Sequence, residues 1–480
     1  MLFATPALTS DDRRVIEEVE IVRAELRRRL ARPCRWEGQL RRSLTAAAVR
    51  GSTHIEGFTI SADEAETLIA GGDISPETDE ATRNAVTGYR DALTYVQHAA
   101  DFPIFAWDHT LFSALHFMMT RAADKEVRPG EYRTGGVRIS GGPNRPPVYT
   151  APDAEHVPAL MGELIHWLAE GDLDAPALVR ASMAHFNLVS IHPWCDGNGR
   201  MSRAVHTLVL ARDGVLAPEF SSIEEWLGAD EFNTREYYAA LREVRTSWQP
   251  ERDTASWIRF CLTAHHLQAQ EVQRRFEAAA RLWFRLERLA EQHRLDERTV
   301  SALYAAAQGH LRRTTYQAEE TLTRDQALAD LRRLRGLGLV EPVGHARTQR
   351  YIGGSVVRGL RGEVHAEVHA DLYREPYGRP GGAGGFALRP GLLRGRSLRM
   401  TESRVAARTR LPPRFRPLGK SLVGGGVRRG NCRTAIRLGR RRRQRIPSCP
   451  DPWPIRRTRP LRRCPSGVRR PDSRARDRSK

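Results

Sequence analysis

Apolar residues recur at helical spacing along most of the first 360 residues of this 480-residue chain. The segment 10–30 shows the pattern clearly, because its apolar residues return every three or four positions and so share one helix face. The polar run Ser10-Asp11-Asp12 at its start is typical of a helix N-terminus. The apolar positions of this predicted helix are Val15, Val19, Val22, Leu26 and Leu30.

The same periodicity predicts further helices, and a change of period predicts one pair of short strands. Alternating residues at 137–140 and 148–150 flank the turn-rich run Gly141-Gly142-Pro143-Asn144, which indicates a β-hairpin with a long tip. By itself this pattern is only that of a surface hairpin. The predicted class is therefore mainly α with a small hairpin. The further helices are expected at 38–50, 76–99, 102–119, 157–169, 175–191 and 204–213.

Residues 281–353 have the pattern of a separate module. Thr323 and Gln326 form a capping box that predicts the start of a helix. Three helices followed by two strands resemble a winged helix-turn-helix. The expected elements are helices at 298–307, 315–320 and from 324 onward, and strands at 339–343 and 349–352.

Two uses of this module remain open, contact with DNA and contact with protein. The resemblance places the start of a recognition helix at Thr323, Arg324 and Gln326, with Arg347 on the wing. Acidic residues expected on the same exposed face would repel phosphate, which favours protein contact instead. These acidic residues are Glu319, Glu320 and Asp330.

The basic charge of the chain is concentrated after residue 360. Residues 361–480 contain 33 Lys and Arg against 8 Asp and Glu, whereas residues 1–360 contain 44 against 49. The net charge of +20 therefore belongs to the C-terminal segment, and the rest is mildly acidic.

From residue 354 onward the helical and strand periodicities disappear, and Arg, Pro and Gly dominate. We expect residues 354–480 to form a disordered tail, because such a composition buries too little apolar surface to offset chain entropy. Its run Arg440–Arg443 offers phosphate contacts to nucleic acid. The alternative is a segment without specific function, such as an out-of-frame translation of a GC-rich gene.

The cysteines and the apolar runs favour a cytoplasmic protein. The six cysteines include no Cys-x-x-Cys spacing, which argues against a zinc or disulfide framework. The N-terminal run Met1-Leu2-Phe3-Ala4 lacks the basic region and long apolar stretch of a signal peptide. No apolar run reaches the roughly 18 residues that a membrane span needs.

One run, residues 192–203, joins the predicted helices 175–191 and 204–213 and gathers polar residues in the turn between them. Pro193 disfavours the α conformation at His192, so the first helix should end there. Gly197 and Gly199 permit positive φ angles on either side of an asparagine. The run is His192-Pro193-Trp194-Cys195-Asp196-Gly197-Asn198-Gly199-Arg200-Met201-Ser202-Arg203.

The residue types in this run suit the binding of phosphate. Arg200 and Arg203 are three residues apart, so both project from the start of the second helix. Cations are unfavourable at a helix N-terminus because they oppose the helix dipole, and an anion bound between the two arginines would offset this cost. Asp196 offers an oxygen ligand suited to Mg²⁺ that bridges phosphates. His192 can take a proton near neutral pH. A lone Gly-Asn-Gly would indicate only an inter-helix turn, but the full ordered run favours a site.

The run resembles the signature of the Fic (filamentation induced by cyclic AMP) family, H-[FP]-x-x-[DE]-G-N-[GK]-R-x-x-R. Every polar position of that pattern is present, and Trp194 and Ser202 depart from common members only at positions without a polar role. The resemblance implies a Fic-type helical core, with the hairpin as a flap that aligns an extended target segment by strand addition.

The resemblance also implies an activity and roles for single residues. The activity is transfer of AMP from ATP to a Ser, Thr or Tyr hydroxyl of a protein target, with His192 as general base and Asp196 as the Mg²⁺ ligand. Arg200 would bind the β-phosphate and Arg203 the γ-phosphate. The implied ATP-binding residues are Gly197, Asn198, Gly199, Arg200 and Arg203, together with Tyr237 and Tyr238 at the adenine.

A second motif, Ser52-Thr53-His54-Ile55-Glu56-Gly57, ends the predicted helix that begins near residue 38. Gly57 is a typical C-terminal stop, and the acid Glu56 is unfavourable there unless it pairs with a cation. The segment resembles the inhibitory motif [ST]-x-x-x-E-[GN] of many Fic proteins, which begins here at Ser52. Its presence before the core implies the N-terminally inhibited class, in which Glu56 pairs with Arg203 and blocks the γ-phosphate.

The sequence therefore predicts an autoinhibited protein adenylyltransferase that uses ATP and Mg²⁺. Its target is an unidentified protein, with the chain itself as one candidate, and a homodimer is left open. The alternatives are a Fic enzyme that removes AMP or transfers another phosphate-containing group, and a DNA-binding regulator whose core senses nucleotide. The predicted parts are a helical region at 1–100 with the inhibitory helix at about 40–57, the core at 101–280, the module at 281–353 and the tail at 354–480.

Overall fold

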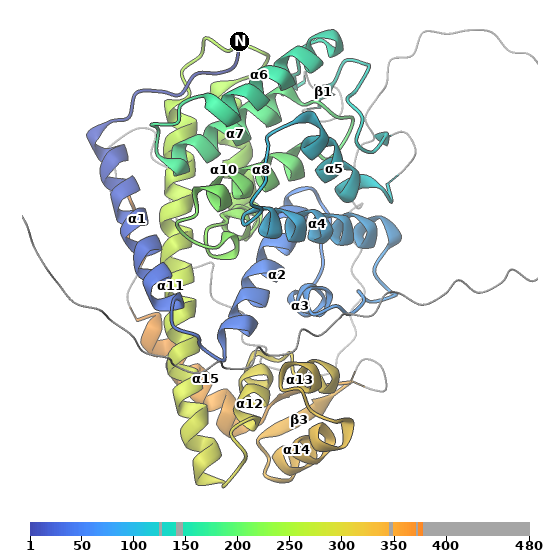
Figure 1. The fold of residues 1–480 in the computed structure, drawn as a ribbon, viewed down its shortest axis with the longest axis vertical. Helices are drawn as coiled ribbons and strands as arrows, with labels where there is room; N and C mark the ends of the chain where they lie inside the picture. The colour runs from blue at the N-terminus through green and yellow to red at the C-terminus, as the bar shows by residue number, and fades with distance from the viewer. Residues whose placement is uncertain (124–126, 141–146, 345–348, 371–372, 378–480) are drawn as a thin grey trace, which may run out of the picture. The chain divides into compact units, whose positions relative to one another are not determined.

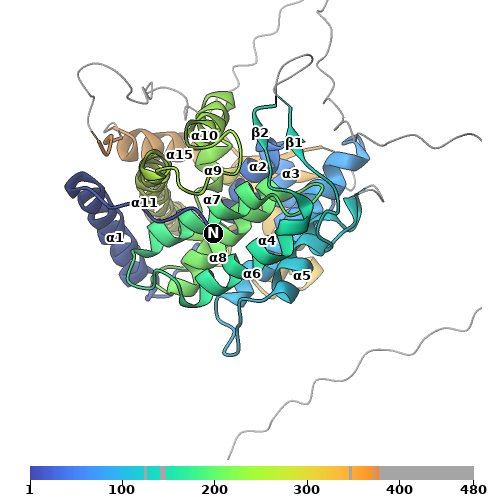
Figure 2. The same cartoon turned by 90° about the horizontal axis from the view of Figure 1, so that it is seen from above.

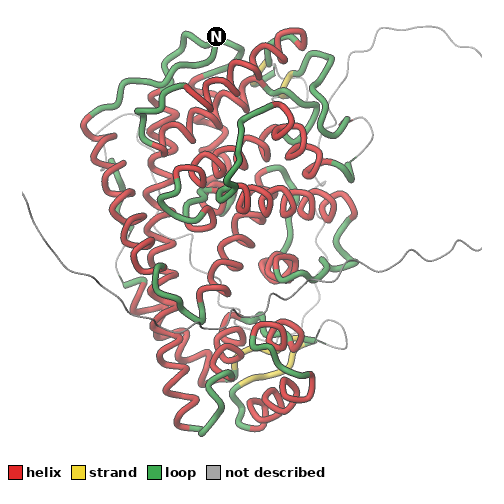
Figure 3. The backbone as a smooth tube through the Cα atoms, viewed as in Figure 1, coloured by secondary structure: helices red, strands yellow, loops and turns green. Residues whose placement is uncertain are grey.

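Helices make up most of the described chain in the computed structural model, and they are the red segments of Figure 3. The structure describes residues 1–123, 127–140, 147–344, 349–370 and 373–377. These belong to one compact unit, Met1–Leu418, whereas the second unit, Gly419–Lys480, lies wholly outside the described residues. The mainly helical class is confirmed, and the described strands form only two small antiparallel hairpins.

The first half of the unit contains α1 to α8 and the hairpin β1–β2 (Figure 1). The helices lie close to the predicted ranges, although two of them begin later, at residues 80 and 109 instead of 76 and 102, where an aspartate caps each N-terminus. The elements are α1 Ser10–Leu30, α2 Glu37–Ile55, α3 Ala62–Ile69, α4 Glu80–Ala99, α5 His109–Thr120, β1 Arg138–Ile139, β2 Tyr149–Thr150, α6 Val157–Glu170, α7 Ala177–Ile191 and α8 Asn198–Asp213.

The second half contains α9 to α15 and the hairpin β3–β4. Its main element is α11, which runs beside α1 and continues past α2 to the helices α12 and α15 (Figure 1). None of the described helices is both long and apolar enough to cross a membrane. The elements are α9 Glu224–Leu227, α10 Glu231–Val244, α11 Ala255–Gln292, α12 Thr299–Gln308, α13 Arg313–Glu319, α14 Arg324–Gly336, β3 Val340–Val343, β4 Arg350–Gly353 and α15 Ser355–Val368.

Helix α1 shows how local sequence sets these boundaries. Its range is the predicted one, and a capping box begins it, because Thr9 accepts a hydrogen bond from the Asp12 amide while the Asp12 carboxylate accepts one from the Thr9 amide. The predicted apolar face is confirmed, since Val15, Val19 and Leu26 are buried. This face packs against α11.

The described residues form two hydrophobic cores, the first mainly among α1 to α10 and the start of α11, the second mainly between the rest of α11 and α12 to α15. The pair α7 and α8 lies at the centre of the first core, as the view in Figure 2 shows. Almost every side chain of both helices is buried, which is the expected state of a helix that is covered on all sides. Helices α4, α6 and α11 pack around the pair. The turn between α7 and α8 is therefore held in a rigid environment.

The hairpin β1–β2 is in the predicted place. Arg138 pairs with Thr150 and Ile139 with Tyr149 in an antiparallel register. The Tyr149 hydroxyl donates to the Ser190 carbonyl at 2.6 Å, which ties the hairpin to the end of α7. The predicted tip, residues 141–146, lies outside the described residues.

Two predicted boundaries in the second half are wrong. The proposed module start at residue 281 falls inside α11, which continues without a break to Gln292 because its apolar face passes from one core to the other. The tail does not begin at residue 354, since α15 forms there and buries Val357 and Val364 against the second core. Residues 378–480, with Arg440–Arg443, lie outside the described residues.

The elements predicted for the module are present. Helices α12, α13 and α14 precede the hairpin β3–β4, and the capping box between Thr323 and Gln326 is confirmed. Arg347, expected on a wing, lies outside the described residues, as do its neighbours 345–348.

The acidic residues that were expected to cover the exposed face of the module are engaged elsewhere. Asp330 is buried, and it accepts hydrogen bonds from Arg298 at 2.8 Å and from the Tyr316 hydroxyl at 2.8 Å. Glu319 pairs with Arg42 and Glu320 with Arg35, so both acids join α13 to the N-terminal half of α2 and its approach. All three acids are therefore paired with arginines, and their effect on phosphate stays a prediction.

The close packing of α2 on α9 generates a stability prediction. A Cβ atom at Gly51 would overlap the Glu224 carbonyl oxygen and lie 2.9 Å from the Glu225 Cα, and backbone atoms cannot move aside cheaply. We expect Gly51→Ala to lower the free energy of unfolding of the full chain by about 1–3 kcal/mol in urea denaturation followed by circular dichroism.

The control for this change is Gly38→Ala on the same helix, where the nearest atom to a new Cβ is the end of the Arg42 side chain at 3.7 Å. It should leave stability unchanged or raise it by about 0.5–1 kcal/mol, because alanine favours the helix. Equal stability of Gly51→Ala and the wild-type protein would contradict the close backbone contact.

Candidate active site

The turn that carries the predicted signature begins where α7 ends. His192 is the C-cap residue, with φ 53° and ψ 57°, and its amide donates to the Leu188 carbonyl at 3.0 Å. The prediction that Pro193 forces His192 out of the α conformation is confirmed. A left-handed conformation costs a residue other than glycine about 1 kcal/mol, so the surrounding contacts must hold His192 in place.

The His192 ring is oriented by the backbone of its own helix. Its Nδ1 lies 3.2 Å from the Val189 carbonyl oxygen, which can only accept. Nδ1 is therefore the protonated nitrogen of the neutral ring, and Nε2 carries the lone pair. This is the tautomer that a general base requires.

Arg133 braces the same turn, and sequence reasoning did not identify it. Its Nε donates to the His192 carbonyl at 2.8 Å and its amide donates to the Pro193 carbonyl at 2.9 Å. Another guanidinium nitrogen donates to the Gly135 carbonyl at 2.8 Å. A buried arginine between the hairpin and the turn thus fixes the backbone of His192, and burial lowers its pKa.

His116 also supports the signature turn, and sequence reasoning did not identify it either. Its Nδ1 accepts from the Gly130 amide at 2.8 Å, so its Nε2 is protonated and donates to the Asp196 carbonyl at 3.0 Å. Its ring stacks on Trp194, with centroids 4.6 Å apart and planes 8° apart. Burial lowers the pKa of His116 to about 4, which keeps it neutral. No sequence motif marked this residue, because its partners are backbone atoms.

The Asn198 side chain shapes the turn. Its Oδ1 accepts from the Trp194 amide at 3.0 Å and its Nδ2 donates to the Trp194 carbonyl at 2.8 Å. Contact between Asn198 and a phosphate stays a prediction. Helix α8 begins at this residue instead of at 204, so the amides of its first turn point into the loop.

The two glycines of the turn serve different needs. Gly197 has a φ of 79°, as predicted. Gly199 is helical and does not use the freedom to adopt a positive φ, but a Cβ atom at this position would overlap the Glu56 carboxylate. Gly199 is thus required for close approach, because the carboxylate lies directly against the start of α8.

Arg203 holds that carboxylate. Its guanidinium donates to Glu56 Oε1 at 2.8 Å, to the Ser52 carbonyl at 2.9 Å and to Ser52 Oγ at 2.7 Å. Burial by itself would lower the pKa of Arg203, but the attraction of Glu56 outweighs this effect, so the pKa is raised. The arginine is 1% exposed, whereas the Glu56 side chain is 27% exposed. The pairing predicted from the two motifs is therefore present.

Arg200 and Asp196 occupy the outer side of the loop. The Arg200 guanidinium lies 3.3 Å from Asp196 Oδ2 and 5.5 Å from the centre of the Phe58 ring. The Asp196 side chain is 43% exposed, whereas that of Arg200 is buried. One accessible carboxylate beside the signature turn would suit Mg²⁺, which commonly takes one or two carboxylates together with phosphate oxygens and water.

The two tyrosines predicted at an adenine have different environments. Tyr237 is 1% exposed and its hydroxyl lies 3.0 Å from His185 Nε2, so this side chain lies in the core, and its contact with the base stays a prediction. Its place on the buried face of α10 decides this. Tyr238 faces outward and donates to the Ile55 carbonyl at 3.2 Å, next to Glu56. His185 itself is fully buried in the core.

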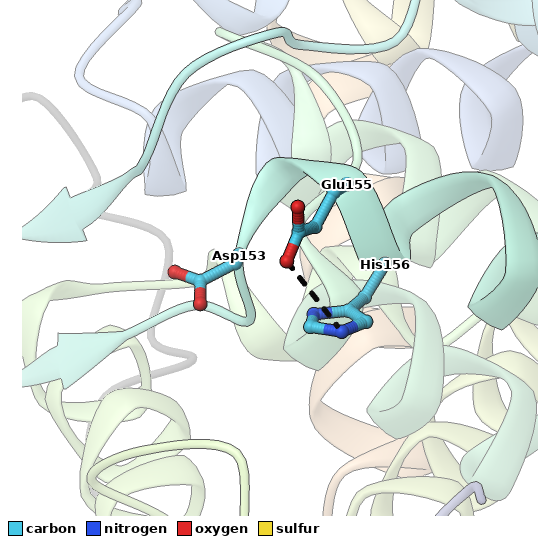
Figure 4. Close-up of side chains that lie close together, drawn as sticks. All are labelled: Asp153, Glu155 and His156. Atoms are coloured by element: carbon cyan, nitrogen blue, oxygen red, sulfur yellow. Dashed lines mark ion pairs between the residues drawn. The ribbon is translucent and has the colours of Figure 1, made fainter.

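Asp153, Glu155 and His156 form a separate group that follows β2 (Figure 4). All three side chains are exposed, and His156 Nε2 lies 3.9 Å from Glu155. The group lacks the buried, oriented partners that characterise the signature turn, so we assign it no role in the site.

The buried neutral state of His116 predicts a pH dependence of stability. The unfolded chain takes up this proton near pH 6.5, but the folded protein only near pH 4. Between these values the unfolded state binds more protons, so the free energy of unfolding falls as the pH falls, by up to about 3 kcal/mol. His116→Gln should lose this part of the slope in urea denaturation between pH 4 and 6.5.

The control is His166→Gln, which changes an exposed histidine of α6. Its slope should match that of the wild-type protein. An unchanged slope for His116→Gln would show that the folded protein protonates His116 at its ordinary pKa.

Comparison with known proteins agrees with the geometry of the turn. Residues 106–210 match the model of the Fic/DOC family. The chain is 26% identical over 246 residues to protein adenylyltransferase fic-1 of Caenorhabditis elegans, which covers 49% of this chain and 43% of the relative. It is 34% identical over 89 residues to protein adenylyltransferase Fic of Drosophila virilis, which covers 18% and 17%. The chain thus spans less than half the length of these relatives.

Solved structures similar to this one include a Fic family protein from Desulfovibrio desulfuricans, with a TM-score of 0.48 and 21% identity over 73% of this chain and 98% of that chain. A fragment of Fic-1 from C. elegans has a TM-score of 0.44 and 21% identity, over 56% and 73%. The family match covers α5 to α8 and includes the complete signature turn. Residues 106–210 are therefore a Fic domain.

Proposed function

We propose that this protein transfers AMP from ATP to a hydroxyl side chain of a protein, and that Glu56 inhibits the transfer. One observation carries the proposal. The anion position between Arg203 and Gly199 is filled by the carboxylate of the chain's own Glu56. A buried arginine that already holds a partly exposed carboxylate is suited to exchange it for a phosphate.

The chemistry rests on His192. Its Nε2 would take the proton of the incoming Ser, Thr or Tyr hydroxyl, whose oxygen then attacks the α-phosphorus of ATP. The new oxygen–phosphorus bond forms as the bond to the β-phosphate breaks, and diphosphate leaves. The tautomer set by Val189 and the brace from Arg133 support this role, because both hold the ring before substrate binds.

The phosphates would lie along the start of α8. The loop amides and Asn198 would face the α-phosphate, Arg200 the β-phosphate and Arg203 the γ-phosphate. Asp196 would hold Mg²⁺, which neutralises phosphate charge when bound. The hairpin β1–β2, anchored through Tyr149, would align the target segment by main-chain pairing.

The alternatives of AMP removal, or transfer of another phosphate-containing group, use the same turn. Removal requires a residue that orients water, and Glu56 is the carboxylate nearest to Gly199. In that case loss of Glu56 would abolish activity, whereas an inhibitory Glu56 would release it. The direction of the Glu56 effect therefore separates the two reactions.

The test is incorporation of label from ATP labelled at the α-phosphate, with the full chain and a cell lysate as substrates. Glu56→Gly should raise labelling at least about tenfold, because the carboxylate no longer competes with the γ-phosphate. His192→Ala in that background should abolish labelling but leave ATP binding, measured by calorimetry. Normal labelling by the His192→Ala protein would contradict the assignment of the base, and no labelling by any variant would contradict the function.

A second candidate function is DNA binding by α12 to α14 with the hairpin β3–β4, which resemble a winged helix-turn-helix. The engagement of Asp330, Glu319 and Glu320 in internal ion pairs favours it, because these acids no longer oppose phosphate. Helix α14 presents exposed basic residues, among which are Arg324, Arg332 and Arg333.

This candidate predicts a salt-dependent change on mutation. Replacing Arg324, Arg332 and Arg333 by alanine in the full chain should reduce the slope of log affinity for duplex DNA against log salt by about 2–3. The matched control replaces three other exposed arginines by alanine, which should leave the slope unchanged. They are Arg13 and Arg27 of α1, and Arg32 just after it. Equal slopes for both triple variants would exclude α14 as the DNA contact.

A further inference from the structure

A cleft of about 400 Å³ lies where the two cores adjoin, and residues of α2, α3, α11, α12 and α15 line it. Figure 1 shows these helices around the lower end of α2. The volume falls within the range of about 300–1,000 Å³ that is usual for small-molecule sites. Neither Glu56 nor any residue of the signature turn lines the cleft, so it is separate from the candidate active site.

The walls of this cleft are charged. Ser43 and Arg50 of α2 share one helix face that points into it, and so do Arg361 and His365 of α15. In all, five arginines and three histidines line the cleft, against four glutamates. A cleft with an excess of one sign of charge concentrates ions of the opposite sign, so this one favours anions.

Three of the four glutamates are already paired with arginines of the same cleft. Glu319 pairs with Arg42, and Arg275 pairs with both Glu225 and Glu271. These ion pairs join α2 to α13 and α11 to α9, which accounts for them as parts of the packing. They leave the remaining arginines of the cleft without these acids as partners.

Two of those arginines are available to a ligand. The side chains of Arg50 and Arg361 make no ion pair and no hydrogen bond within the described residues. Arg50 is half-buried, whereas Arg361 is exposed, so the cleft is open to solvent on the side of α15. A guanidinium presents a planar fork of donors that matches the oxygens of a phosphate or a carboxylate. Both arginines can therefore bind an oxyanion without first losing a partner.

The fourth glutamate adds a second requirement. Glu66 of α3 lines the same cleft and makes no ion pair in the described part of the chain. Its carboxylate accepts hydrogen bonds and repels a bare anion, whereas a hydroxyl group of a ligand can donate to it. A ligand that carries hydroxyl groups beside its anionic group satisfies both kinds of wall.

We propose that this cleft binds a small hydroxylated organic anion, whose charge is balanced by Arg50 and Arg361 and whose hydroxyl groups face Glu66. The anionic group is a phosphate, as in a sugar phosphate, or a carboxylate, as in a hydroxycarboxylic acid. The site stands apart from the signature turn, so the inference does not rest on the proposed transfer of AMP.

Calorimetry with the full chain tests the site, with ribose 5-phosphate and citrate as separate probes. At least one probe should bind with a Kd of about 1 mM or below, and the tighter one identifies the anionic group. Arg50→Gln and Arg361→Gln should each weaken that binding at least about tenfold, because each change removes a charged donor to the oxyanion.

Two control variants locate the binding. Arg358→Gln lies on the same helix as Arg361 but outside the cleft, where Arg358 pairs with Glu341 at the surface, and it should leave the affinity unchanged. Arg200→Gln alters the signature turn and should also leave the affinity unchanged. Circular dichroism should show that every variant keeps the helical content of the wild-type protein.

The outcomes that would overturn the proposal are specific. They are the absence of binding by both probes, an affinity that neither Arg50→Gln nor Arg361→Gln changes, and binding that Arg200→Gln abolishes, since the anion would then lie in the signature turn. Should Arg50→Gln not fold, Arg361→Gln decides alone, and an unchanged affinity of that variant would refute the site.

Discussion

The buried charge of Arg203 is the constraint around which the site is built. A guanidinium that is 1% exposed needs oxygen partners, and α2 supplies them through Ser52 and Glu56, which accept from Nε and from one terminal nitrogen. The C-terminus of α2 and the start of α8 are thereby drawn together, and α9 packs closely on α2 at Gly51. The close contacts at Gly51 and Gly199 exist because these elements approach so nearly.

The contacts around the signature turn fall into a rigid group and a replaceable one. Arg133 and His116 bond backbone atoms of the turn and are buried, so they set the shape of the loop permanently. Glu56 bonds a side chain and remains partly exposed, so its carboxylate is open to water. Such a division suits a site whose catalytic group is always in position and whose nucleotide position is controlled.

Helix α2 also connects this site to the second core. Its last turn leads to Glu56, while Arg42 in its first half pairs with Glu319 of α13, and Arg35 just before it pairs with Glu320. A helix transmits displacement along its axis because its backbone hydrogen bonds are stiff, so the two ends of α2 are mechanically linked. Helices α12 and α13 therefore contact the same element that leads to Glu56.

Local sequence determined most helix ranges and the signature turn, because periodicity and caps depend on residues close together in the chain. The pairing of Glu56 with Arg203 was expected only from the resemblance of the two motifs to those of the Fic family. Tertiary structure alone decided the rest. Tyr237 lies in the core because of how α10 packs, Asp330 pairs with Arg298 at the start of α12, and His116 and Arg133 reach the site from distant segments. Their partners are backbone atoms or hydroxyls, which leave no pattern in the sequence.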